Sequence, residues 1–132
     1  YGSLMGWNEL ICNGSSGMMQ AVLPYFAKRG LFAEIINDIL PYYDLFPFVA
    51  AGIPGISLGR KNCICGRFFH HRPDDNMARL SVPLMASLLQ VLVDFAGDLA
   101  GKDGLPFPAG IPREQLAKVR KFWHDLFGGW NG

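Results

Sequence analysis

The sequence predicts an α/β fold in which a mixed, largely parallel sheet is flanked by helices. Segments typical of strands and helices follow one another in the order strand, helix, strand, strand, helix, helix, which favours a layered arrangement. Half of the residues are hydrophobic and 17% are charged, with a mean hydropathy of +0.17, as expected for a chain that buries a sheet. At 132 residues the chain is long enough for one compact core.

Three segments have the composition of strands. Residues 4–12 end in an apolar run and meet Asn13-Gly14, a strong turn signal. Residues 32–40 are rich in Ile and Phe, which predicts a second strand, although their mixed pattern leaves a helix open. A loop and a helical turn are expected over residues 42–51, and after a Gly-x-Pro break a short β-type run predicts a third, buried strand that ends near Leu58.

Two longer segments have helical periodicity and expected caps. Either Ser15 or Ser16 can cap the first helix, which is expected to end at Gly30; its apolar positions are Met18, Val22 and Phe26. Pro24 lies inside this pattern and should kink or shorten the helix. Ser81 can cap the second helix, which runs to Gly101; its apolar stripe contains Leu84, Leu88, Val91, Phe95 and Leu99. Polar interruptions make it a poor membrane span, so we expect it to pack on the sheet.

A third helix is expected at the end of the chain. Residues 102–110 form a Gly/Pro loop, and residues 111–127 then have the pattern of an amphipathic helix. Pro112 suits the first turn, and Glu114 can pair with Lys118 four residues on. The expected buried face contains Leu116, Val119, Trp123 and Leu126. Residues 1–132 are therefore expected to form a single domain or part of one.

Charge and cysteine content exclude some classes of function. A net charge of +1 with no basic run gives no electrostatic reason to expect binding to nucleic acid or to an anionic membrane. Three cysteines leave at least one thiol unpaired, so the redox compartment stays open. Cys63 and Cys65 have a spacing that is unusual for a zinc site, which favours a structural role. The opening Tyr-Gly-Ser-Leu has no initiator Met or signal peptide, and predicts a processed, cut or partial chain.

The densest group of chemically active side chains lies between the third strand and the second long helix. Residues 70–75 contain two imidazoles and two carboxylates, which can act as metal ligands or as acid and base groups. Taken alone, a pair of histidines in a surface loop is more often solvated than metal-bound. An aspartate before a proline, as at Asp44, is in its simplest interpretation the cap of a turn.

Three blocks of sequence nevertheless carry a family resemblance. They are Asp44-x-x-Pro47-Phe48, then Ala51-Gly52-Ile53-Pro54-x-Ile56, then His71-x-x-x-Asp75-Asn76 followed by a helix. In this order and spacing they resemble the C-terminal part of the zinc aminopeptidases of the di-zinc exopeptidase superfamily. Glutaminyl cyclases and the transferrin-receptor ectodomain share that fold. The resemblance covers residues 1–101 and is closest over residues 43–80.

The resemblance implies a peptidase that hydrolyses N-terminal peptide bonds of peptides with two zinc ions, a bridging water and a Glu as general base. It makes His71 the last metal ligand of that centre, and it slightly favours a secreted or periplasmic location. The residues it places in the wall of the substrate pocket are Asp44, Phe48, Phe68, Phe69 and His70. Asp75 and Asn76 would hydrogen-bond within the ligand loop or cap the following helix.

The chain also departs from the family pattern. Leu45 stands where a histidine is usual and Tyr43 where a serine is common. The other ligands and the general base of the family have no match here, since Glu9 and Glu34 are too isolated, so we assign no catalytic residue. Because zinc needs three or four protein donors, an upstream segment or a second chain must supply the rest. Otherwise the chain is an inactive relative, such as a non-catalytic interaction domain. A glutaminyl-cyclase-like acyltransferase with one zinc is a third possibility.

Overall fold

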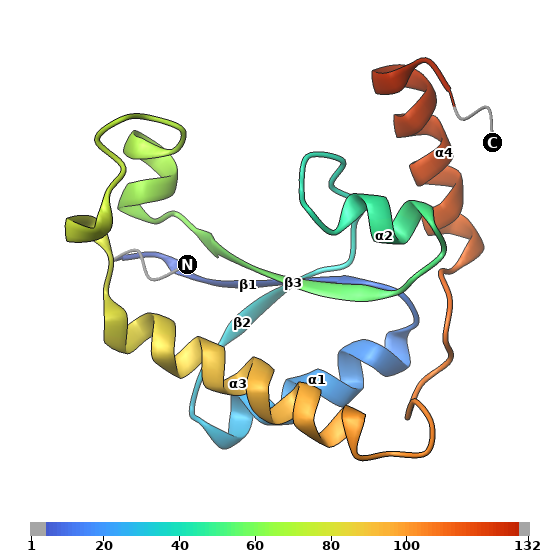
Figure 1. The fold of residues 1–132 in the computed structure, drawn as a ribbon, viewed down its shortest axis with the longest axis horizontal. Helices are drawn as coiled ribbons and strands as arrows, with labels where there is room; N and C mark the ends of the chain where they lie inside the picture. The colour runs from blue at the N-terminus through green and yellow to red at the C-terminus, as the bar shows by residue number, and fades with distance from the viewer. Residues whose placement is uncertain (1–4, 130–132) are drawn as a thin grey trace.

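The computed structural model describes residues 5–129 and has an α/β fold, as expected (Figure 1). Its sheet contains β1 (Trp7–Asn13), β2 (Ala33–Ile36) and β3 (Gly55–Lys61) in the order β2-β1-β3. β1 pairs in parallel with β2 and antiparallel with β3. The sheet is therefore mixed, but the prediction of a largely parallel sheet is wrong for the described strands. β2 ends and β3 begins at the same end of the sheet, on either side of β1, so β3 runs antiparallel to β1.

Helices cover both faces of the sheet (Figure 1). Successive side chains of a strand point to opposite faces, and β1 follows this rule: Leu10 and Cys12 enter one apolar cluster, and Ile11 enters another. The first cluster is completed by α1 (Ser16–Lys28) and α3 (Val82–Ala100). The second is completed by α2 (Phe46–Ala50) and α4 (Arg113–Phe127).

α1 has the buried face that its periodicity predicts. Met18, Val22 and Phe26 are all buried, at 3% exposure or less. Pro24 does not shorten the helix, which continues to Lys28, and its side chain is exposed. Ser15 is at the N-cap position, but its hydroxyl makes no cap hydrogen bond.

α3 packs on the sheet through Leu88, Val91 and Phe95, three members of the predicted stripe. Ser81 caps it as predicted, since its hydroxyl oxygen accepts the backbone N–H of Leu84 at 3.4 Å. Among residues 5–129, α3 is the one helix long and apolar enough to cross a membrane. One such helix is weak evidence for a span, because core helices of soluble proteins pass the same test.

α4 differs from its prediction in three respects. It begins at Arg113 and not at residue 111, within the usual uncertainty of a helix end. Its buried residues are Gln115 and Val119, whereas Leu126 is 56% exposed. Trp123 and Phe127 face α2, where both rings approach Phe46, so Leu126 is turned away. Lys118 does not pair with Glu114: its ammonium lies 2.6 Å from the carboxylate of Asp38, which follows β2.

Two short helical turns connect β3 to α3. A π-helical turn spans Cys65–Phe69 and a 3-10 turn spans Met77–Arg79. The histidine loop, residues 70–76, lies between them. Residues 101–112 form the second long connection and contain no helix or strand, in agreement with the loop predicted over 102–110.

Candidate functional site

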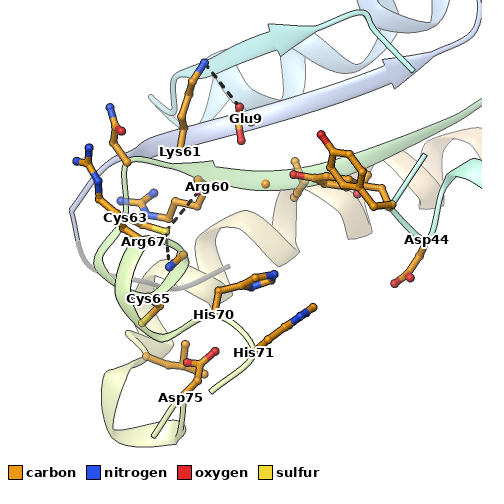
Figure 2. A pocket seen from close by; sticks show the side chains of 18 residues that line it. Glu9, Asp44, Arg60, Lys61, Cys63, Cys65, Arg67, His70, His71 and Asp75 are labelled. Atoms are coloured by element: carbon orange, nitrogen blue, oxygen red, sulfur yellow. Dashed lines mark hydrogen bonds and ion pairs between the residues drawn. The ribbon is translucent and has the colours of Figure 1, made fainter. Parts of the chain in front are cut away.

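A pocket of about 720 Å³ opens at the carboxyl end of β3 (Figure 2). Its wall combines Glu9 of β1, residues 42–44 of the loop before α2, the carboxyl half of β3 and the histidine loop. Glu9 lies two residues before Ile11, so the pocket opens on the sheet face that α2 and α4 cover. Segments far apart in sequence therefore meet at one concave site.

The two histidines form one wall of this pocket. His70 and His71 stack with ring centroids 3.9 Å apart. Figure 2 shows both rings extending toward the segment that carries Asp44, with Asp75 below them. Both side chains are exposed, so their ring nitrogens are accessible from the pocket.

The backbone at His71 is unusual, with φ at +58°. A residue with a Cβ rarely adopts this left-handed conformation and pays about 1–3 kcal/mol to be held in a sparsely populated region. Such residues cluster at active sites, ligand clamps and switch regions, although Met5 and Asn62 of this chain also have positive φ. The conformation turns the chain sharply after the first histidine, and it lets two successive rings stack on the same side of the loop.

Buried thiols support the histidine loop from below. The Cys63 sulfur lies 3.4 Å from the carbonyl oxygen of Arg60 and accepts the N–H of Gly66 at 3.3 Å. The Cys65 thiol lies 3.5 Å from the carbonyl oxygen of Arg79. Both cysteines are buried and free of disulfides, which agrees with the structural role expected for them.

Arg79 fixes the other end of the loop. Its guanidinium lies 3.5 Å from the centre of the Phe69 ring, and its Nε donates to the carbonyl oxygen of Asp74 at 2.7 Å. Asn76 caps the 3-10 turn, because its side-chain oxygen accepts the N–H of Ala78 at 3.1 Å. The loop is thus held at both ends while its histidines stay exposed.

The predicted site residues divide into two groups. Asp44, His70, His71 and Asp75 all line the pocket, although they come from two separate segments. The three phenylalanines lie outside its lining: Phe48 on α2 is 56% exposed, Phe68 is 61% exposed, and Phe69 is covered by Arg79. Their assignment to the wall of a substrate pocket stays a prediction.

Sequence reasoning missed the charged groups on the sheet side of the pocket. The ammonium nitrogen of Lys61, on β3, lies 3.1 Å from a carboxylate oxygen of Glu34 and 3.9 Å from a carboxylate oxygen of Glu9. The indole N–H of Trp7 and the Lys61 ammonium hold the pKa of Glu34 below its usual value. Glu9, set aside as isolated, lies opposite Gly59 of β3. Its alternation with Leu10 is the signal that could have placed it on this face.

Arg60 is also in the pocket wall, but its guanidinium is engaged. It donates to the side-chain oxygen of Asn8 at 2.7 Å and to the carbonyl oxygens of Met5 and Gly6. It therefore ties the end of β3 to the start of β1. The histidines and the two aspartates also line the pocket, on the side away from the sheet (Figure 2).

The chain matches no protein-family model, no curated protein and no solved structure in the comparisons made. The resemblance to zinc exopeptidases accordingly rests on the three sequence blocks. The structure adds their arrangement: residues of the first and last blocks, and the strand that follows the middle block, line one pocket.

The described residues can contribute to a zinc centre but do not complete one. Among residues 5–129 no three His, Cys, Asp or Glu side chains lie close enough to hold a metal ion together. Zinc takes three or four protein donors. The imidazole of His71 is exposed and could donate one nitrogen to a metal ion. The thiols of Cys63 and Cys65 are buried beneath the loop.

Proposed function

We propose that this chain is the C-terminal part of a zinc-dependent, aminopeptidase-type exopeptidase that hydrolyses N-terminal peptide bonds. In this proposal His71 binds zinc in a centre whose other donors lie outside residues 1–132. One observation supports it above the others: Asp44 of the first family-like block and the His71–Asp75 loop of the last block line the same pocket, together with the carboxyl half of β3.

The resemblance places the metal ligand at His71 and not at His70. His71 occupies the strained position, and its ring is braced by the stacked ring of His70. A braced imidazole loses less side-chain freedom when it binds a metal. Zinc, when bound, would supply a water of lowered pKa and would polarise the substrate carbonyl.

The aspartates have different roles in this proposal. Asp44 lies across the pocket from the histidines (Figure 2), where an exposed carboxylate can bind the positively charged amino terminus of a peptide. Asp75 lies beneath His71 and its backbone N–H donates to the carbonyl oxygen of Arg72 at 3.0 Å. It therefore helps to hold the turn that orients the ligand.

The test is a comparison of the three histidines in the natural protein that contains these residues. His71→Ala should lower zinc content and hydrolysis of aminoacyl nitroanilides by at least about 10–100-fold, the loss seen when even an indirect partner of a metal ligand is removed. His124→Ala is the matched control, because this ring is on α4 and its side chain is 81% exposed. His70→Ala should keep the zinc. Full zinc content and activity in His71→Ala would overturn the proposal.

A second candidate is a non-catalytic interaction domain with the same fold. It is favoured by the absence of any three-donor group among residues 5–129. A natural protein that contains no zinc and hydrolyses no peptide would support it. Cyclisation of an N-terminal Gln peptide without hydrolysis would instead indicate an acyltransferase of the glutaminyl-cyclase type.

A further inference from the structure

Two opposite charges without ion-pair partners lie on separate segments of the pocket wall. Arg67 belongs to the π-helical turn and Asp44 to the loop before α2, and both line the cavity. Among residues 5–129, neither the Arg67 guanidinium nor the Asp44 carboxylate makes an ion pair or a hydrogen bond. Figure 2 shows Arg67 beside Cys63 and Asp44 on the other side of the histidines. The pocket therefore offers a positive end and a negative end to a ligand.

The other cations of the wall are already engaged. Lys61 pairs with Glu34 and Glu9, and Arg60 donates to the side chain of Asn8 and to two backbone carbonyl oxygens. An anionic group that enters the pocket can bind the guanidinium of the π-helical turn without displacing an existing ion pair. Because the acceptors of Arg60 are uncharged, its own positive charge adds to the potential at this end.

The turn fixes the backbone of Arg67 and leaves its side chain exposed. The N–H of Arg67 donates to the carbonyl oxygen of Cys63 at 3.1 Å, and the N–H of His70 donates to that of Cys65 at 2.8 Å. A guanidinium is a planar fork that binds a carboxylate through two parallel hydrogen bonds. Arg67 is therefore suited to hold a ligand carboxylate from an anchored position.

The negative end has the features of an ammonium site. Tyr42 and Tyr43 precede Asp44 and line the same wall; their ring centroids are 5.8 Å apart, and Tyr42 is 80% exposed. An ammonium group is attracted by a carboxylate and by the face of an aromatic ring. A phosphate or a second carboxylate would be repelled at this end, so the chemistry of the two ends together favours a zwitterion.

The size of the cavity sets the length of that zwitterion. Its volume is about 720 Å³, and a sphere of this volume would be about 11 Å across. An extended peptide spans at most about 3.3–3.6 Å per residue, so about three residues reach from one end to the other and a single amino acid does not. The ionisable groups are also spread along the wall, since among residues 5–129 no three His, Cys, Asp or Glu side chains gather at one point.

We propose that this pocket binds short free peptides, of about two or three residues, by both of their ends. Arg67 binds the C-terminal carboxylate, and Asp44 binds the N-terminal ammonium beside Tyr42. The inference rests on the proposed function for the reaction, which it restricts to di- and tripeptides. Binding by the two ends requires no metal ion, so it can be tested separately from hydrolysis.

The experiment is calorimetric titration of the natural protein with ω-aminooctanoate. This probe has as many bonds between its nitrogen and its carboxyl carbon as a tripeptide has, and it contains no bond that a peptidase could cleave. Octanoate lacks the ammonium and ω-aminooctanamide lacks the carboxylate. We expect each of them to bind about tenfold or more weakly, as expected for the loss of a hydrogen-bonded charge. γ-Aminobutyrate is too short to reach both ends and should bind no better than octanoate.

A charge-neutral variant identifies the carboxylate end. Arg67→Met should weaken binding of ω-aminooctanoate by about tenfold or more and should leave binding of ω-aminooctanamide unchanged, which also shows that the variant is folded. Arg120→Met is the matched control, since Arg120 is exposed on α4 and outside the pocket, and it should change neither affinity. Equal binding of octanoate, ω-aminooctanamide or γ-aminobutyrate, or no effect of Arg67→Met, would overturn the proposal.

The two proposals can fail separately. If ω-aminooctanoate binds by both ends but His71→Ala keeps its zinc, the peptide site stands and the zinc proposal fails. If His71→Ala loses zinc and activity but ω-aminooctanoate binds no better than octanoate, only the restriction to short free peptides fails.

Discussion

Gln115 tests how α4 is attached to the sheet. It is 4% exposed; its side-chain oxygen accepts the N–H of Gly14 at 3.0 Å, and its amide nitrogen donates to the Asn37 side-chain oxygen at 2.7 Å. Gln115→Ala leaves the buried Gly14 N–H without a partner, which costs about 1–3 kcal/mol. Lost packing adds about 1 kcal/mol. We expect the free energy of unfolding to fall by about 2–4 kcal/mol.

Urea denaturation followed by circular dichroism measures this change, provided that the slope of the free energy against urea stays constant. Gln20→Ala is the matched control, since Gln20 is exposed on α1, and it should alter stability by less than about 0.5 kcal/mol. If Gln115→Ala changes the free energy of unfolding as little as Gln20→Ala does, this side chain does not hold α4 to Gly14 and Asn37.

Two further predictions concern titratable groups. Burial raises the pKa of the Cys12 thiol to about 11, so iodoacetamide at about pH 8 should label Cys12 only after denaturation. Peptide mass spectrometry measures the labelling. Labelling of Cys12 in the folded chain at the rate of a free thiol would contradict this prediction. The hydrogen bond from Lys118 lowers the pKa of Asp38 from its ordinary value of 3.8. The Asp38–Lys118 pair therefore stabilises the fold fully when the pH is above 3.8, and this stabilisation is lost as the pH falls through the lowered pKa of Asp38. Lys118→Met should lower the free energy of unfolding by at most about 1 kcal/mol at neutral pH, and it should have no effect at a pH at which Asp38 is protonated. Unfolding experiments at both pH values measure this difference. An equal loss of stability at both pH values would show that charge pairing is not the cause.

The elements were predictable because each depends on a local period. In α1 the spacing of Met18, Val22 and Phe26 alone identifies the buried face. Turn and cap signals were equally local, as at Ser81. The direction of β3 was not predictable in this way, because it depends on where residues 37–54 leave the sheet. The buried amide of Gln115 was missed for a related reason: its partners, Gly14 and Asn37, are distant in sequence.

The site was predictable only as a set of fragments. Sequence blocks identified Asp44, His71 and Asp75, but nothing local indicated that Asp44 would lie across a pocket from the histidine loop. Glu9 and Lys61 joined the wall through the antiparallel pairing of β1 with β3. Pairing of strands is a long-range property, so a single sequence with no match to compare leaves such contacts undetermined.

The strain at His71 and the incomplete donor set of the pocket have one explanation under the proposed function. The pocket contains a histidine held in a strained conformation, yet the described residues offer too few donors for zinc. A backbone that costs free energy at one residue persists when surrounding structure holds it, and here the two buried thiols and Arg79 do so. Under the proposed function, zinc bound by His71 and by donors from outside residues 1–132 would favour this conformation, so metal binding and the order of the histidine loop should be thermodynamically linked.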